Sequence, residues 1–357
     1  MNRQDALTTS LYSQLLEEAI ANECIAYYPG LQGSFAKEKR REKLYWYWVG
    51  RINQKVSRIY IGPDNLETQK LVNNLEQRKD VALDAIKSLK KTAKAYKGAS
   101  GQINEPSHFK VIKSLSEQGL FKKDILLIGS HGFLSICNAL GISVENSFLK
   151  TTDVDFVRPQ GITLAIPNNK DIIDIPSAIS RFDKNFFPIP KLDNKEPSTS
   201  LQNNTSKIKI DFLTTEESGR KNVFYEDLGI AAESLKFMSY LLNGDIFKGL
   251  IIGNYAIPVN LPDPARFAVH KLIISEERAS FFQSKSKKDR SQASVLLDYL
   301  INDDSEHLED ALLACKTIKG AVKNIKKSLL KLNDDSIVKF ITKVLNDEPS
   351  EDSGMHF

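Results

Sequence analysis

The segment Asp124–Val157, DILLIGSHGFLSICNALGISVENSFLKTTDVDFV, decides the expected fold of this chain. Four consecutive apolar residues predict a buried strand, which ends in a Gly-Ser turn before a helix-like stretch. The last residues alternate as a strand does, and this period places Asp153 and Asp155 on the same face. Two carboxylates held so close repel each other unless a positive charge lies between them. We therefore expect a hard divalent cation here, Mg²⁺ or Mn²⁺.

The turn between the first strand and the helix supplies the other half of the expected site. Gly129 and Ser130 stand where a strand ends and a helix begins. Backbone N–H groups at such a helix start point outward and bind phosphate oxygens, with help from a hydroxyl group. A cation site beside a phosphate site predicts a nucleoside triphosphate as ligand.

This arrangement resembles the DNA polymerase β nucleotidyltransferase superfamily, whose signature is an apolar-Gly-Ser turn, a helix, and apolar residues around Asp-x-Asp. In that superfamily a third carboxylate comes from a later strand, and Lys207–Leu213 offers Asp211 in a strand-like context. The resemblance implies a catalytic and metal-binding triad of Asp153, Asp155 and Asp211. It also implies transfer of a nucleoside monophosphate from a triphosphate to an acceptor hydroxyl, with release of pyrophosphate.

Further motifs narrow the resemblance. The chain contains Gly-Ser-His-x-Phe, a long connection over 131–152 to Thr-x-Asp-x-Asp-Phe, then Pro-Ala-Arg-Phe-Ala-x-His-Lys-Leu, Lys-Asp and Gln-Ala. Over roughly residues 100 to 300 it is similar to a bacterial group of uncharacterised nucleotidyltransferases that is distantly similar to the AbiEii and MenT toxins. The resemblance implies nucleotide contacts from Lys271, Arg278 and Asp289. It also implies an RNA acceptor such as a tRNA 3′ end, and a possible antitoxin partner.

Each motif also has a structural interpretation. An isolated Asp-x-Asp is usually a solvated turn or strand edge, and Lys271 and Arg278 fit a solvated helix face. Two other functions stay open from the sequence. One is a nucleic-acid-binding protein in which the nucleotidyltransferase fold no longer catalyses; the other is an AMPylation-like enzyme that modifies a protein hydroxyl.

Composition excludes several classes of protein. The chain has 357 residues, 41% hydrophobic and 26% charged, so it can bury a core and is not a disordered protein. The net charge of +4 permits a nucleic-acid partner without requiring one. Three widely separated cysteines predict neither disulfides nor a metal cluster, and the polar start lacks a secretory leader. No apolar run is long enough to span a membrane, and we expect a cytoplasmic protein.

A basic, aromatic segment precedes the core. The run Tyr45–Val49 alternates as a strand, and a second run, Val56–Ile61, predicts a small antiparallel sheet. Interleaved cations and aromatic rings suit phosphates and stacked bases, although the same rings also suit the core of so small a sheet. The segment resembles short basic modules of DNA-handling proteins. The candidate nucleic-acid contacts are Arg40, Arg41, Lys43, Trp46, Trp48, Arg51, Lys55 and Arg58.

The remaining pattern sets the expected architecture. Helices are predicted over 7–25, from Asp64 to about Gly98, and from Pro264, where the polar face would carry Arg266, His270 and Lys271. Residues 162–166 suggest a strand and 187–205 a loop. We predict an α+β fold, with a polymerase β-like mixed-sheet core, a small basic N-terminal β/helical module and a C-terminal helical bundle. The boundaries are 1–104, 105–225, 226–346 and an acidic tail at 347–357.

Overall fold

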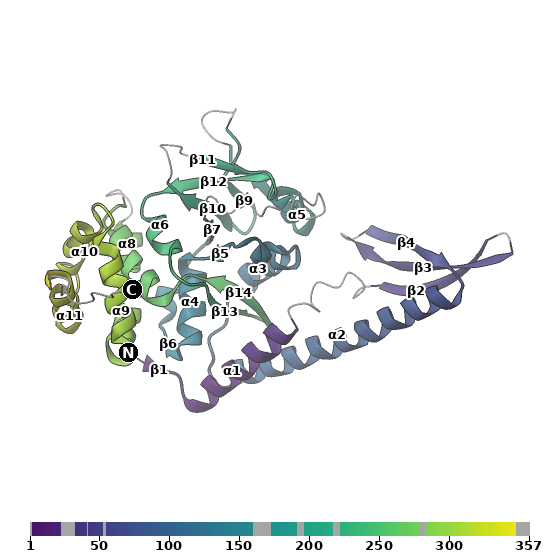
Figure 1. The fold of residues 1–357 in the computed structure, drawn as a ribbon, viewed down its shortest axis with the longest axis horizontal. Helices are drawn as coiled ribbons and strands as arrows, with labels where there is room; N and C mark the ends of the chain where they lie inside the picture. The colour runs from purple at the N-terminus through teal and green to yellow at the C-terminus, as the bar shows by residue number, and fades with distance from the viewer. Residues whose placement is uncertain are drawn as a thin grey trace, which may run out of the picture.

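A computed structural model describes residues 2–22, 33–40, 42–52, 55–159, 173–190, 196–216, 222–278 and 283–347 (Figure 1). The fold combines helices with a mixed sheet, as the predicted α+β class requires. A central sheet lies beside a group of C-terminal helices, and a small N-terminal sheet projects on a long helix. Candidate residue Arg41 and the side chains of Arg51 and Lys55 lie outside the described part, as does the strand expected at 162–166.

The central sheet has seven described strands and a mixed topology. Its main path runs β11-β12-β10-β7-β5, and β9 joins β10 while pairing with β8 on its other side. Strand β10 is parallel to β7 and β12, whereas β5 is antiparallel to β7. The strands are β5 (Leu126–Leu127), β7 (Asp153–Arg158), β8 (Phe186–Pro188), β9 (Ser200–Asn203), β10 (Lys209–Thr215), β11 (Asn222–Tyr225) and β12 (Ile230–Leu235).

The two central strands alternate between an apolar and a polar face. Phe156 of β7 and Phe212 of β10 pair in register, and their buried rings stack at a centroid distance of 5.6 Å. Because successive side chains point to opposite faces, the residues just before them, Asp155 and Asp211, share the other face. The apolar face builds the core, so the strand register is fixed by packing and the carboxylates are positioned by it.

Helices and a hairpin surround this sheet. The hairpin of β13 and β14 packs against α4, and the short strand β1 pairs with β6. The elements are β1 (Asn2–Arg3), α3 (Pro106–Glu117), α4 (Gly129–Ala139), β6 (Ile142–Ser143), α5 (Ile175–Phe182), α6 (Met238–Leu242), β13 (Phe247–Ile252) and β14 (Ala256–Leu261), with 3-10 turns at Leu120–Lys123 and Asn146–Phe148.

The C-terminal helices pack around α7 (Pro264–Ser275). Nearly every residue of α7 is buried, because its sequence is apolar on all sides apart from a few polar positions. The predicted polar face is therefore not exposed, and the structural alternative of a solvated face is wrong for Lys271: His270 and Lys271 are both buried. The other helices are α8 (Gln283–Asp303), α9 (Ser305–Lys316), α10 (Ala321–Leu329) and α11 (Asp335–Asn346). Among the described residues, no helix combines the length and the apolar character that crossing a membrane requires.

The N-terminal sheet has three antiparallel strands, one more than the two runs predicted. They are β2 (Gly33–Arg40), β3 (Lys43–Ile52) and β4 (Lys55–Pro63). The 33-residue helix α2 (Leu66–Gly98) follows, with the Asn65 side chain accepting from the Thr68 N–H at its start. Helix α1 (Ala6–Ala21) packs along the C-terminal part of α2, where Tyr12 and Leu15 meet Ala93 and Tyr96.

The expected loop at 187–205 is wrong. Strand β8 overlaps its start and β9 falls within it, and β9 pairs with the Asp211 strand. Turn-rich composition hid these strands, because each has only three or four residues. The central sheet also continues past residue 225 into β12, so the core boundary predicted there passes between two paired strands.

Candidate active site

Asp153, Asp155 and Asp211 lie on one face of the central sheet. Asp153 and Asp155 are two residues apart on β7, and Asp211 of β10 is the direct register partner of Asp155. Burial, together with the nearby carboxylates of Asp211 and Asp153, raises the pKa of Asp155 to about 6. The three side chains therefore form one cluster of mutually repelling negative charge.

The Gly-Ser turn lies directly against this cluster. Gly129 begins α4 with φ at +67°, and a Cβ atom there would lie 2.0 Å from Oδ2 of Asp155. No side chain caps this helix, and its first intrahelical hydrogen bond comes from the Gly132 N–H to the Ile128 carbonyl. The N–H groups of residues 129–131 thus have no intrahelical partner, and helix starts of this kind are the ones at which proteins bind anions.

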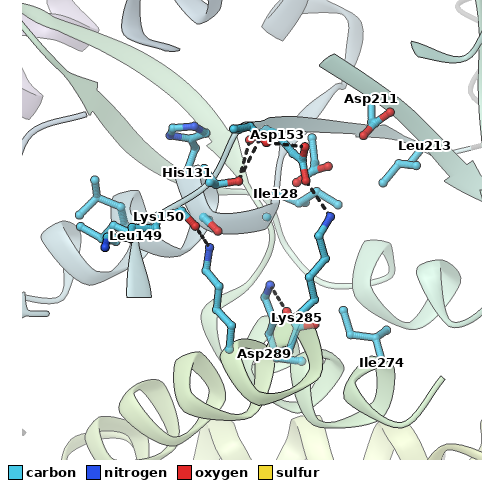
Figure 2. A pocket seen from close by; sticks show the side chains of 18 of the residues that line it. Ile128, His131, Leu149, Lys150, Asp153, Asp211, Leu213, Ile274, Lys285 and Asp289 are labelled. Atoms are coloured by element: carbon cyan, nitrogen blue, oxygen red, sulfur yellow. Dashed lines mark hydrogen bonds and ion pairs between the residues drawn. The ribbon is translucent and has the colours of Figure 1, made fainter. Parts of the chain in front are cut away.

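A wall of cations faces the carboxylates. Lys271 comes from α7, Arg278 follows that helix, and Lys285 and Lys288 come from the first turns of α8. Figure 2 shows Lys285 extending from its helix to Asp153, where the ammonium lies 2.9 Å from Oδ2. Burial and the neighbouring Lys271 lower the pKa of Lys288 to about 8.

One cavity of about 1360 Å³ lies between the two walls, and the carboxylates, Gly129, Ser130 and the four cations all line it. Residues 107–316, more than half of the chain, match a family described as nucleotidyltransferase. The chain belongs to this nucleotidyltransferase family. No curated protein and no solved structure matches it. Membership supports the general reaction of this class, transfer of a nucleoside monophosphate.

The nucleotidyltransferase holds two of its candidate nucleotide-binding cations through one carboxylate. Asp289 is buried, and its oxygens lie 2.8 Å from Lys271 Nζ and 2.6 Å from Arg278 Nε. Burial alone would raise the pKa of Asp289, but the two cations outweigh it and lower that pKa. Asp289 thus positions Lys271 and Arg278 at the cavity edge. Both of its carboxylate oxygens are engaged by these two cations.

Sequence reasoning missed three side chains that contact the carboxylates. Lys285 pairs with Asp153; Lys209 lies 2.8 Å from Asp211, and Ser200 of β9 donates to Oδ1 of the same carboxylate. Lys209 had a signal, since it stands two residues before Asp211 on one strand and so shares its face. Ser200 and Lys285 had none, because their contacts depend on the tertiary fold.

His131, next to Ser130, is a further cavity residue that sequence reasoning left without a role. The Asn104 amide is oriented by the Ile252 N–H, which donates to its Oδ1, so its Nδ2 donates to Nδ1 of His131 at 3.2 Å. Burial lowers the pKa of His131 to about 3, which leaves the neutral ring with its proton on Nε2. Nε2 is buried and has no partner in the described structure. His131 can therefore offer one N–H donor to a ligand.

The carboxylates have the chemistry that a hard cation requires, but they are not arranged as a preformed metal-binding site. Within the ranges that the structure describes, no three His, Cys, Asp or Glu side chains are gathered as metal ligands. Asp153 and Asp211 instead pair with Lys285 and Lys209. All donors in the cluster are carboxylate oxygens, the ligands that Mg²⁺ and Mn²⁺ prefer. Burial, followed by the neighbouring Asp211 and Asp153, raises the pKa of Asp155, and this effect is larger than the opposing effect of Lys271 and Lys285.

Replacing Gly129 by alanine is expected to lower NMP transfer by about 100-fold or more, because a displacement of about 1 Å at a reacting group has that effect. The new methyl group would meet Asp155, and the positive φ would cost alanine about 1–2 kcal/mol. Steady-state kinetics and thermal unfolding measure the two effects.

The matched control is Gly98→Ala at the end of α2, where a Cβ meets nothing within 4 Å. This variant should keep full activity and gain up to about 1 kcal/mol of stability. Wild-type activity in Gly129→Ala would contradict the proposed contact between the turn and Asp155.

Proposed function

We propose that this nucleotidyltransferase transfers a nucleoside monophosphate from a nucleoside triphosphate to a hydroxyl of RNA, at an end such as the tRNA 3′ end. The observation that supports this proposal best is the pair of opposed walls in one cavity. Carboxylates of β7 and β10 form one wall and cations of α7 and α8 form the other. A triphosphate needs cations for its oxygens, and a metal-assisted transfer needs carboxylates beside them.

The triphosphate tail binds at the start of α4. The N–H groups of Gly129 and Ser130, together with the Ser130 hydroxyl, hold the β- and γ-phosphates. Lys271 and Arg278, fixed by Asp289, face the charge that develops on the leaving pyrophosphate. Lys285 turns from Asp153 to the phosphates when the nucleotide arrives, since the same ammonium serves either anion.

Asp153, Asp155 and Asp211 are the residues that would hold two divalent cations, Mg²⁺ or Mn²⁺. Bound cations supply charge neutralisation of the triphosphate and activation of the attacking hydroxyl. Lys285 and Lys209 neutralise Asp153 and Asp211 in the unliganded protein, so cation binding competes with two ion pairs. Asp155 makes no ion pair among the described residues, although Lys271 and Lys285 lie close enough to oppose the rise of its pKa.

The reaction forms one bond and breaks one. The attacking RNA hydroxyl oxygen bonds to the α-phosphorus, and the bond from that phosphorus to the oxygen bridging to the β-phosphate breaks. Asp211 takes the hydroxyl proton, because Ser200 and Lys209 hold its carboxylate in place on the acceptor side. Pyrophosphate leaves with the bridging oxygen.

The cavity has room for two substrates. Its volume of about 1360 Å³ exceeds the range of about 300–1,000 Å³ for pockets that hold one small ligand. The basic N-terminal sheet favours a polyanionic acceptor, and this favours RNA over a protein hydroxyl.

Labelled nucleotides test the proposal directly. The protein is incubated with each α-labelled triphosphate, total cellular RNA and total protein, with Mg²⁺, Mn²⁺ or a chelator. We expect label in the RNA pool, its loss with the chelator, and its loss in Asp153→Ala. Label confined to protein would support the AMPylation-like alternative instead. Absence of both label and metal-dependent triphosphate binding by calorimetry would leave a binding protein without catalysis. A toxin role with an antitoxin partner stays a prediction from the resemblance alone.

A further inference from the structure

The N-terminal sheet carries more positive charge than the whole chain does. Residues 33–63 contain eight lysines and arginines and two glutamates, a net charge of +6, whereas the chain has a net charge of +4. The rest of the protein is therefore net negative. A single small sheet accounts for the basic character of the molecule, and this concentration favours a polyanionic partner.

One face of this sheet packs against α2. A Cβ at Gly62 would meet Thr68 of α2, and Lys79 of α2 donates to the Gly33 carbonyl. Trp48 shares this face, and its ring lies against Gly33 with 5% of the residue exposed. The candidate tryptophans thus belong to the helix-facing side; Trp46 is half-buried and donates to Asp64.

The opposite face, which we call the open face, carries three tyrosines and several cations. Its tyrosines are Tyr45, Tyr47 and Tyr60, with the rings of Tyr47 and Tyr60 at 5.6 Å. The guanidinium groups of Arg58 and Arg40 lie 4.2 Å and 5.3 Å from the Tyr47 ring centre. Tyr47 is therefore covered, and Tyr60 is 54% exposed. Because Arg40 and Arg58 cover the Tyr47 ring, this part of the face presents cations rather than a free ring to a partner, and cations contact the phosphate backbone.

Helix α2 sets the distance between the open face and the cavity. The sheet contacts α2 near Thr68 and Lys79, and α2 ends at Gly98, six residues before the cavity residue Asn104. At 1.5 Å per residue the sheet lies roughly 30–45 Å along the helix from this end. Figure 1 shows the sheet at the far end of α2, away from the core.

We propose that the open face binds the duplex stem of the acceptor RNA while the 3′ end of that RNA enters the cavity. This inference rests on the proposed function and adds that transfer depends on stem length. At the roughly 3.4 Å per step of a DNA duplex, 30–45 Å corresponds to on the order of ten base-pair steps, and to slightly more in the A-form RNA duplex, whose steps are shorter. A duplex is stiff over this distance, so a stem that is too short reaches only one of the two contacts.

The experiment uses the full chain and a series of RNA hairpins that share one 3′ end, with stems of about 4, 8, 12, 16 and 20 base pairs. We expect kcat/KM for labelling to rise about tenfold or more between the short and the long stems and then to level off, as for a second tethered contact. The variant Arg40→Gln/Lys43→Gln removes two exposed cations of the open face. It should label all stems at the rate of the shortest.

The matched control is Lys339→Gln/Lys343→Gln, which removes the same charge from exposed positions of α11. Labelling by this control variant should depend on stem length in the same way as labelling by the wild-type protein. Labelling that is equal for all stems in wild type overturns the inference and leaves the proposed function intact. A length dependence that the Arg40/Lys43 variant keeps also overturns it.

A binding measurement without catalysis tests the stem contact separately from the proposed nucleotide transfer. Fluorescence anisotropy of the longest labelled hairpin is measured with the full wild-type chain and with the full Arg40→Gln/Lys43→Gln chain. We expect about tenfold or more weaker binding in the variant and a salt slope smaller by about two, one unit per lost phosphate contact. Equal affinities of the two proteins overturn the inference, whether or not any RNA is labelled. Absence of labelling counts against the proposed function alone. Equal labelling and binding of a DNA duplex of the same length would overturn the assignment to RNA.

Discussion

Asp155→Asn is expected to abolish nucleotide transfer, with kcat lower by at least about 1000-fold, because a carboxylate at the centre of the proposed cation site is replaced by a neutral amide. The same variant should unfold at a temperature equal to or above that of wild type in a chelator at pH 7.5. Burial and the neighbouring Asp211 and Asp153 raise the pKa of Asp155 to about 6, so its ionised form is held at a cost above that pH. Asparagine keeps the shape and removes the charge.

Glu233→Gln is the matched control for this prediction. Glu233 lines the same cavity on β12, but it is exposed and pairs in register with Leu213 rather than with a candidate ligand. The same acid-to-amide change there should keep kcat within about threefold, well under one tenfold step of 1.36 kcal/mol. If Asp155→Asn kept substantial activity, or if both variants lost activity equally, the carboxylate cluster would not be the catalytic centre.

Asp289→Asn is expected to have the largest effect on stability, a loss of about 3–5 kcal/mol, because it leaves a buried lysine without its counterion. Lys271 and Asp289 have side chains that are 7% and 5% exposed, and their charged atoms are 2.8 Å apart. Urea unfolding measures the loss. The lowered pKa of Asp289 means that its stabilisation is present above its ordinary value of 3.8 and is lost as the pH falls through the lower folded value. The acid side of the stability profile should therefore be flatter in Asp289→Asn.

A double variant separates packing from nucleotide binding. Lys271→Met/Asp289→Leu removes both buried charges, and apolar replacement of a buried ion pair is often neutral or stabilising. Arg278 is 32% exposed and can turn to solvent. We expect this variant to recover most of the stability but not the triphosphate affinity, measured by calorimetry. Recovery of both would show that Lys271 and Asp289 serve the fold alone.

The sequence predicted the centre of this structure better than its surroundings. The apolar run, the Gly-Ser turn and the two-residue spacing of Asp153 and Asp155 are local patterns, and the structure places Asp211 beside Asp155 as the family resemblance implied. Period-two alternation carries this information because the apolar face of each strand must be buried. The catalytic role of these residues stays a prediction.

What the sequence did not predict depends on partners distant in the chain. Lys285 meets Asp153 across 132 residues, and Ser200 reaches Asp211 from a strand of four residues in a turn-rich segment. The burial of α7 was not predicted, because the charge of Lys271 is matched by Asp289 on another helix. Local patterns do not encode such pairings.

The long helix that separates the N-terminal sheet from the core constrains how this protein can change its reach during evolution. Each added residue advances an α-helix by about 1.5 Å but also turns it by about 100°. A single residue inserted in the N-terminal part of α2, which α1 does not cover, would therefore rotate the open face to another side of the molecule. Insertions or deletions of about seven residues, close to two turns, preserve the orientation and change the span by about 10 Å. Relatives with substrates of different size should therefore differ in the length of this helix by multiples of about seven residues.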